Sequence, residues 1–250
     1  MSRSEKPTLP GDSAATTFSS FPEGGIAVVF GAGGGIGSAL VERLRAADRF
    51  TEVIAFSRAS TPAIDLLDEA SLAEAAAFAA GHGDIRLAID ATGFLHDDSQ
   101  GPEKSWRELD AEKLARAFAL NAIGPALLMK HLLPRLPRSG KAVFATLSAR
   151  VGSIGDNRLG GWYGYRASKA ALNQLVRTAS VELSRRSAEA LCVALHPGTV
   201  ATGLSAPFAA TGLKVQTPDD SAAHLLAVID ALPPEATGGF FDWRGEVVPW

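Results

Sequence analysis

Cysteine is almost missing from this chain of 250 residues, in which Cys192 is the only one. One cysteine cannot form an intramolecular disulfide or a cysteine-based zinc site, and a reducing cytoplasm is the compartment we expect. Because Leu191 and Val193 flank it, Cys192 is expected to be a buried hydrophobe rather than a reactive thiol. The five histidines form no His-x-x-x-His pair, so no metal site is predicted.

An excess of one charge and long apolar runs are also missing. The 24 Lys and Arg oppose 27 Asp and Glu, and a net charge of −3 gives no field that would attract nucleic acid or an acidic membrane surface. No run reaches the ~20 consecutive apolar residues of a membrane span. Residues 1–23 mix Ser, Thr, Pro and charge, so we expect a flexible tail rather than a signal peptide or a membrane anchor.

Strand-like apolar runs alternate with helical periodicity along residues 24–250. Strands are predicted at 26–30, 52–56, 85–89, 141–147 and 191–195, with a closing strand within 238–250. Helices are predicted at 38–47, 69–80, 111–133, 162–186 and 218–231. This alternation indicates a single α/β domain of the Rossmann type, with a doubly wound parallel sheet and helices on both faces.

A glycine-rich turn separates the first strand from the first helix. Backbone N–H groups in such a turn can approach a pyrophosphate, and the helix N-terminus adds a partial positive charge there. The spacing is G-x-x-x-G-x-G rather than G-x-G-x-x-G, and a merely flexible turn is the alternative. The candidate cofactor-binding residues of this turn are Gly31, Gly33, Gly34, Gly35, Ile36 and Gly37.

Ser57 and Arg58 follow the second predicted strand, 20 and 21 residues after Gly37. In this fold an acidic residue at that distance binds the ribose of NAD, whereas an arginine accommodates the 2′-phosphate of NADP. No Asp or Glu lies between Glu52 and Asp65 to repel a phosphate. The sequence therefore favours NADP, and the alternative is that Arg58 is an ordinary exposed cation.

Tyr165 and Lys169 lie four residues apart in a predicted helix, which brings their side chains to one face. A cation close to a tyrosine stabilises the phenolate, so the phenol can exchange a proton nearer to neutral pH. Reduction of a carbonyl needs such a proton at the oxygen when hydride reaches the carbon. Taken alone, the pair is more typical of an amphipathic surface helix.

Several motifs together resemble the short-chain dehydrogenase/reductase family, from Ile26 to the C-terminus. The matching motifs are Gly31-x-x-x-Gly35-Ile36-Gly37, Asn121, Tyr165-x-x-x-Lys169 and Pro197-Gly198-Thr199-Val200-x-Thr202. They have the order and separation that the family shows, and jointly they are highly specific. Gly152-Ser153-Ile154, followed by residues 163–169, resembles the branch that includes the C-factor signalling protein and sniffer-type carbonyl reductases.

The resemblance implies roles for individual residues. Lys169 would also hold the nicotinamide ribose, and Asn121 would anchor a water that links Lys169 to solvent. The adenosine half would contact Asp65, Leu66, Ala91, Thr92 and Gly93, and the nicotinamide half would contact Pro197, Gly198, Val200 and Thr202. A homodimer or homotetramer built on the helices at 111–133 and 162–186 is implied as well.

Two departures from the family pattern stand out. The family usually has Asn-Asn-Ala-Gly where this chain has Asp90-Ala91-Thr92-Gly93, a stretch that supports the sheet and the cofactor ribose. With Gly152 in register, Ala149 takes the place of the serine that binds substrate. We predict Ser148 as the replacement, although strand alternation points it to the opposite side, and Ser153 is the alternative.

The sequence thus predicts a cytoplasmic NADP(H)-dependent oxidoreductase that interconverts a carbonyl and an alcohol. Tyr165 would be the acid/base, Lys169 and Asn121 would complete the relay, and a small-molecule carbonyl or alcohol would be the substrate. The substrate pocket is expected at residues 94–98, 153–162 and 204–217, whose apolar bias suggests a hydrophobic compound. The alternative is an NADP(H)-binding signalling or sensor protein of the C-factor type with little activity.

Overall fold

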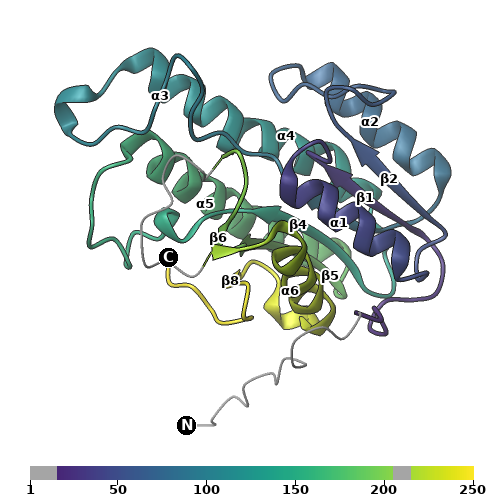
Figure 1. Cartoon of the computed structure of the whole chain (residues 1–250). Helices are drawn as coiled ribbons and strands as arrows, with labels where there is room; N and C mark the ends of the chain where they lie inside the picture. The colour runs from purple at the N-terminus through teal and green to yellow at the C-terminus, as the bar shows by residue number, and fades with distance from the viewer. Residues whose placement is uncertain (1–15, 205–214) are drawn as a thin grey trace, which may run out of the picture.

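The computed structural model describes residues 16–204 and 215–250 and contains a six-stranded parallel sheet of order β2-β1-β3-β4-β5-β8 (Figure 1). The strands are β1 (Ile26–Phe30), β2 (Glu52–Phe56), β3 (Ile85–Asp90), β4 (Ala142–Leu147), β5 (Ala190–His196) and β8 (Phe240–Asp242). Because the chain reverses direction across the sheet between β1 and β3, the carboxyl ends of these two strands define the switch point where α/β proteins bind ligands.

Helices cover both faces of the sheet, as Figure 1 shows. The long helices are α1 (Gly35–Ala46), α2 (Glu69–His82), α3 (Ala111–Phe118), α4 (Gly124–Leu132), α5 (Tyr163–Arg186) and α6 (Pro218–Ala231). Side chains alternate along β1, so that Val28 packs with Leu72 and Leu172 in one core, and Val29 packs with Leu40 in the other. The predicted doubly wound α/β fold is confirmed.

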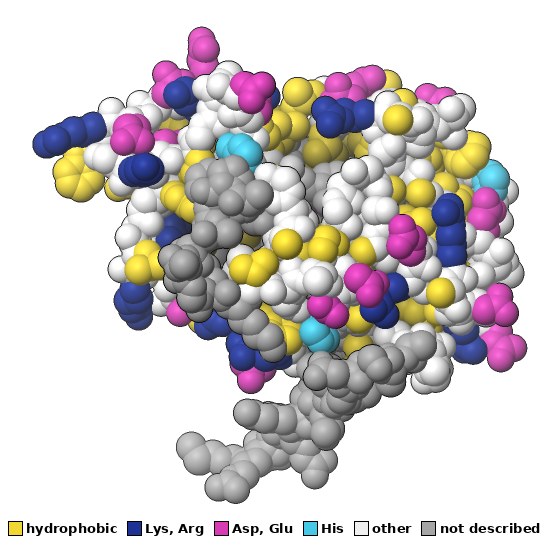
Figure 2. Space-filling view, viewed as in Figure 1, with side chains coloured by type: hydrophobic (Ala, Val, Ile, Leu, Met, Phe, Trp, Pro, Cys, Tyr) yellow, Lys and Arg dark blue, Asp and Glu magenta, His cyan; other side chains and the backbone are white. Residues whose placement is uncertain are grey.

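Short elements connect these parts. They are η1 (Trp106–Glu108), η2 (Ala119–Ile123), η3 (Leu133–Arg135), η4 (Arg150–Gly152), η6 (Pro234–Ala236) and a small parallel pair formed by β6 (Thr199–Val200) and β7 (Val215–Gln216). No helix in the described part of the chain is long and apolar enough to span a membrane. Acidic and basic side chains are interspersed on the face seen in Figure 2.

The helix predicted at 111–133 is interrupted in the structure. It consists of α3, a five-residue π-helical turn (η2) and α4, which has Pro125 in its first turn. Pro125 has no N–H with which to continue the α-helical hydrogen-bond pattern, and a single π turn absorbs the irregularity. The interruption lies at Asn121, one of the predicted site residues.

The N-terminal tail predicted over residues 1–23 is wrong for its second part. Phe18 and Phe21 are 0% and 1% exposed, and both rings pack edge-on against Phe50. Lys141 joins the same segment to α6. Its Nζ donates to Ser20 Oγ at 2.9 Å and to three carbonyls at the end of α6. Aromatic burial therefore attaches residues 16–23 to the domain, and residues 1–15 lie outside the described part.

Candidate functional site

The glycine turn lies between β1 and α1 at the switch point of the sheet. Gly31 has a φ of +81°, and Gly34 N–H donates to Gly31 O at 3.0 Å. A Cβ on Gly37 would lie 2.2 Å from Gly31 O, and one on Gly35 would lie 3.1 Å from the Thr202 side chain. The turn therefore needs glycine. Helix α1 follows it with no side-chain cap and no acidic residue in its first turn, which suits an anion.

Two further segments reach the glycine turn. Ser57 follows β2, and a Cβ added to Gly33 would lie 3.6 Å from the Ser57 Cβ. The Ser57 Oγ accepts from Ala59 N–H at 3.1 Å. The neighbouring Arg58 is exposed, with no ion pair to a described carboxylate. After β3, the main chain of Ala91 lies 2.9 Å from the place of a Gly31 Cβ. The predicted phosphate and ribose residues are thus brought together.

Asp65 and Leu66 lie between β2 and α2. The Asp65 Oδ1 accepts from Leu67 N–H at 2.9 Å, and the Leu66 Cβ is 2.8 Å from the place of a Cβ on Gly124. Because Gly124 begins α4 directly after the π turn, Leu66 packs close to the element that carries Asn121. Their predicted contact with adenine stays a prediction.

Tyr165 and Lys169 lie on the first two turns of α5. The Lys169 Nζ is 5.9 Å from the centre of the Tyr165 ring, and it donates to Leu147 O at 2.8 Å. Burial raises the pKa of Tyr165 to about 12, since it disfavours the phenolate. Burial also lowers the pKa of Lys169 to about 8, against the opposing effect of Asp90. At neutral pH the phenol therefore keeps its proton beside an ammonium group.

Asn121 connects the segment after β3 with α5. Its Oδ1 accepts from Phe94 N–H at 2.8 Å, and its Nδ2 donates to Phe94 O at 2.8 Å and to Ser168 Oγ at 3.1 Å. A Cβ on Gly93 would lie 3.7 Å from Lys169 Nζ and 3.9 Å from Asn121 Oδ1. The structure thus gathers Asn121 and Lys169 around Gly93, although they come from different elements.

Both candidate serine hydroxyls have partners within the protein. Ser148 is 3% exposed, and its Oγ donates to Asn173 Oδ1 on α5 at 2.6 Å. Ser153 is 1% exposed, and its Oγ accepts from Asp156 N–H at 3.1 Å. Ala149, between them, offers no hydroxyl. Which serine orients a substrate therefore stays a prediction.

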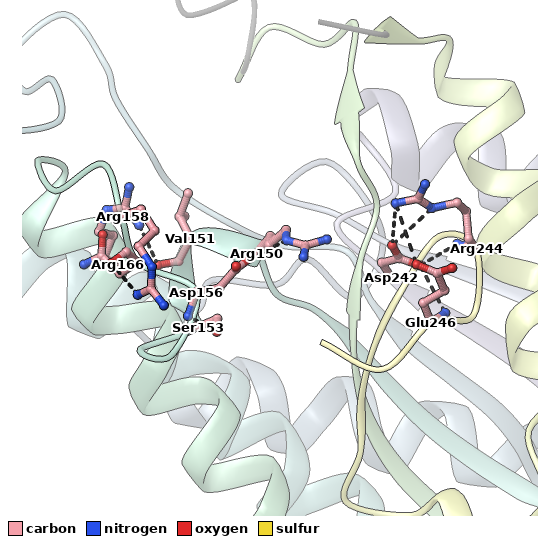
Figure 3. A network of polar contacts seen from close by, with 10 residues as sticks. Arg150, Val151, Ser153, Asp156, Arg158, Arg166, Asp242, Arg244 and Glu246 are labelled. Atoms are coloured by element: carbon pink, nitrogen blue, oxygen red, sulfur yellow. Dashed lines mark hydrogen bonds and ion pairs between the residues drawn. The ribbon is translucent and has the colours of Figure 1, made fainter. Parts of the chain in front are cut away.

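Polar contacts hold the segment that follows β4 (Figure 3). Arg150 Nε donates to Asp156 Oδ2 at 2.5 Å, and Arg166 Nη1 donates to Val151 O at 3.2 Å. Across from them, Arg244 pairs with the buried Asp242 at 3.2 Å. The bond from Arg166 joins η4 to α5, and the place of a Cβ on Gly152 in η4 is 2.8 Å from Lys169 Cβ.

The 197–202 segment closes the site from the β5 side. Pro197 O accepts from Gln216 Nε2 and Ser221 Oγ, each at 3.1 Å, while Gly198 has a φ of +82° with Trp243 packed against it. Val200 is buried, and Thr202 lies beside Gly35. The predicted lining at 204–217 falls mostly on residues 205–214, outside the described part. No group of His, Cys, Asp and Glu in the described part is arranged to hold a metal.

Glu103 is a site residue that the sequence analysis did not find. It is 4% exposed, and its Oε2 accepts from Gly164 N–H at 3.1 Å, while its main-chain O accepts from Trp162 N–H at 2.5 Å. Trp162 begins α5 in the left-handed conformation without a side-chain cap, so Glu103 caps the helix that carries Tyr165. Its only sequence signal is an acidic residue in a long segment.

Comparison with known proteins adds to this geometry. A family model described as Enoyl-(Acyl carrier protein) reductase matches residues 31–225. C-signal of Myxococcus xanthus is 41% identical over 143 residues, which are 57% of this chain and 82% of that protein. The 1-hydroxy-2-glutathionyl-2-methyl-3-butene dehydrogenase of Rhodococcus sp. (strain AD45) is 37% identical over 142 residues, 57% of this chain and 61% of that protein.

Solved structures agree in fold. An NADPH-bound carbonyl reductase from chicken fatty liver has a TM-score of 0.79 at 27% identity, covering 93% of this chain and 97% of that one. The carbonyl reductase Sniffer of D. melanogaster has a TM-score of 0.77 at 23% identity, covering 92% and 100%. Fold and site together define a Rossmann-type oxidoreductase. The chain belongs to the short-chain dehydrogenase/reductase family, which confirms the resemblance seen in the sequence.

Proposed function

We propose that this protein interconverts a carbonyl and an alcohol with NADP(H), using Tyr165 as the acid/base. The observation that carries the proposal is the convergence of Lys169 and Asn121 beside Gly93, with the Tyr165 ring 5.9 Å from Lys169 Nζ, next to a glycine turn that a Cβ would fill. The similar chicken reductase is NADPH-bound, and the similar Rhodococcus protein is named a dehydrogenase. These likenesses support both the cofactor and the reaction.

Each residue of the site has its own role in the proposed reaction. When bound, the nicotinamide cofactor supplies or accepts the hydride. In reduction, the Tyr165 phenol donates its proton to the carbonyl oxygen, and the Lys169 ammonium stabilises the phenolate left behind. Asn121 holds the Phe94 main chain beside this pair, and we propose that it anchors the water that reconnects Lys169 with solvent.

The glycine turn and the Ser57 turn fit the pyrophosphate and the 2′-phosphate of NADP(H), respectively. The α1 N-terminus, which has no side-chain cap and no acidic residue in its first turn, would hold the pyrophosphate with main-chain N–H groups, and the exposed Arg58 would bind the 2′-phosphate. Titration of the protein with NADPH and NADH, followed by fluorescence, tests this preference. Tighter binding of NADH than of NADPH would contradict it.

Tyr165→Phe tests the mechanism. We expect the variant to bind NADPH as the parent does, because the phenol hydroxyl is not needed for binding, and to lose at least about a hundredfold in kcat on a panel of ketones and aldehydes. Tyr163→Phe is the matched control, since Tyr163 is the one other tyrosine. A Tyr165→Phe variant as active as the parent would rule out this role.

A second candidate function is signalling or sensing with little turnover. The 41% identity to C-signal favours it, and so do the engaged hydroxyls of Ser148 and Ser153 beside Ala149. It is distinguished by tight NADPH binding without turnover of any carbonyl or alcohol in a broad panel. We rank it second because Tyr165, Lys169 and Asn121 are all present.

We further propose a homo-oligomer that forms through α4 and α5, and the cytoplasm as its compartment. The groove between the two helices is lined by apolar residues such as Met129 and Leu183, and Leu175 at its border is 37% exposed. We infer the cytoplasm from Cys192, which is a free and fully buried thiol, because a reducing compartment keeps thiols free.

A further inference from the structure

Asp90, the residue that replaces the family's asparagine at the end of β3, is a fully buried carboxylate at 0% exposure. Its Oδ1 accepts from Thr92 N–H at 3.0 Å and from Thr92 Oγ1 at 2.5 Å, and its Oδ2 accepts from Thr146 Oγ1 at 2.7 Å. All three donors are neutral. A buried charge is costly unless an opposite charge compensates for it.

Lys169 is a buried cation whose Nζ lies at the end of the neighbouring strand β4. It is 2% exposed, and its Nζ donates to Leu147 O, on the residue that follows Thr146 in β4. Because Asp90 and Thr146 are directly paired in the sheet, the carboxylate and the ammonium lie at the carboxyl ends of neighbouring strands. The place of a Cβ on Gly93, three residues after Asp90, is 3.7 Å from Lys169 Nζ.

Neutral groups also lie near Lys169. Its Nζ donates to the Leu147 carbonyl of β4 and lies 5.9 Å from the ring centre of the protonated Tyr165 phenol on its own helix. From η2, the Asn121 amide oxygen is 3.9 Å from the place of a Cβ on Gly93, to which Lys169 Nζ is also close. Asp90 is the charged group that raises the pKa of Lys169, in opposition to the burial that lowers it to about 8. No carboxylate in the described part of the chain lies within ion-pair distance of Lys169.

We propose that Asp90 is a positioning residue that keeps Lys169 in the ammonium form and thereby extends the activity of the site to higher pH. This rests on the proposed function, in which the ammonium stabilises the Tyr165 phenolate. As the pH rises through the pKa of Lys169, the ammonium loses its proton and reduction slows. Without the charge of Asp90, this loss begins at a lower pH, because burial then acts unopposed.

Asp90→Asn is the decisive variant. Asparagine has the same shape, its oxygen still accepts from Thr92, and it is the residue that the family usually carries, so the fold accommodates it. We expect the alkaline limb of kcat/KM for carbonyl reduction to move down by about one pH unit, a tenfold loss above pH 9, with unchanged activity near pH 6. Thr146→Val removes a hydrogen bond to Asp90 but keeps the charge of Asp90. This variant should leave the pH of the alkaline limb of kcat/KM unchanged.

A second readout does not depend on turnover. In the full chain with ¹³C-labelled lysine side chains, an NMR titration follows Lys169, assigned with Lys169→Met. Asp90→Asn should lower the pKa of Lys169 by about one unit. Lys141, whose pKa burial lowers to about 8 while Asp230 acts on it, is the internal control and should not move.

The outcomes separate the two proposals. An unchanged Lys169 pKa in Asp90→Asn overturns the role of Asp90, whatever the activity. A lowered Lys169 pKa without turnover of any carbonyl by the parent leaves the effect of Asp90 on Lys169 established and contradicts the proposed function. A shift of Lys141 equal to that of Lys169 also overturns the inference, because it indicates a general change in structure.

Discussion

The hydroxyl of Ser148 is already a donor, since it points at Asn173 Oδ1 over 2.6 Å. To donate to the substrate oxygen it must leave Asn173 without that partner, and this holds for a carbonyl and for an alcohol, because Tyr165 takes the one proton of the alcohol. Ser153 differs, because its Oγ accepts from the main chain of Asp156 and its proton stays available. The two serines therefore differ in what a hydrogen bond to the substrate oxygen costs.

Ser148→Ala tests the predicted substrate-orienting role. We expect kcat/KM for alcohol oxidation to fall about tenfold, the equivalent of one neutral hydrogen bond of about 1.4 kcal/mol, with unchanged NADP⁺ binding. Ser153→Ala is the matched control and should change oxidation less than twofold. The opposite ranking of the two variants would move the role to Ser153.

At the residue scale, the sequence predicted the groups that do chemistry better than the groups that support them. Tyr165 and Lys169 are four residues apart, so helical periodicity alone places them on one face. Asn173 and Glu103 reach their partners over 25 and 61 residues, and no local pattern encodes such contacts. The charge of Asp90 was visible in the sequence, but its burial beside Lys169 results only from the pairing of β3 with β4.

At the scale of elements, α5 depends on a cap from elsewhere in the chain. Gly160, Gly161 and Trp162 all have positive φ, so the chain turns sharply into the helix, and Trp162 supplies no capping side chain. Glu103 supplies it and places a negative charge at the helix N-terminus, where the dipole favours it. Tyr165 follows Gly164 directly, so fraying of this turn would displace the acid/base.

Glu103→Ala should lower kcat about fivefold and the melting temperature by about 2–4 °C, both equivalent to a lost cap of about 1 kcal/mol. Glu103→Gln keeps an acceptor and should restore most of kcat, which a role of the charge alone would not allow. Glu108→Ala is the control, because Glu108 caps an exposed turn at Lys104 in the same segment. Steady-state kinetics and thermal melts read out both effects, and a parent-like kcat in Glu103→Ala contradicts the capping role.

Element boundaries show where pattern reading fails. Short apolar runs predicted the strands β1 and β2 to the residue, because these segments differ sharply from their flanks. The closing strand predicted within 238–250 is only three residues long, since Gly245 has a φ of +76° and Asp242 binds the N–H groups of Arg244 and Glu246. A turn held by one side chain leaves little trace in hydrophobic periodicity.

At the scale of the whole molecule, the doubly wound parallel sheet was predicted from the alternation of strands and helices, whereas the attachment of the N-terminal segment was not. Two phenylalanines among polar residues gave no periodic signal, yet Phe18 and Phe21 complete a core against Phe50. Isolated aromatic residues can anchor an extended segment without any regular secondary structure, so tail predictions based on composition fail where such anchors exist.

The proposed homo-oligomer would form through the groove between α4 and α5. The groove between α4 and α5 is lined by small and apolar side chains, Ala126 and Ala179 among them, which let a second helix pair approach closely. Leu175→Arg places a charge in this groove and should convert the proposed dimer or tetramer to a smaller species by light scattering. Leu159→Arg, at a side chain that is 92% exposed on the loop before α5, should leave the mass unchanged. A monomeric parent, or an assembly disrupted by Leu159→Arg and not by Leu175→Arg, would rule out the α4 and α5 face, because only burial of that groove makes a charge at Leu175 costly.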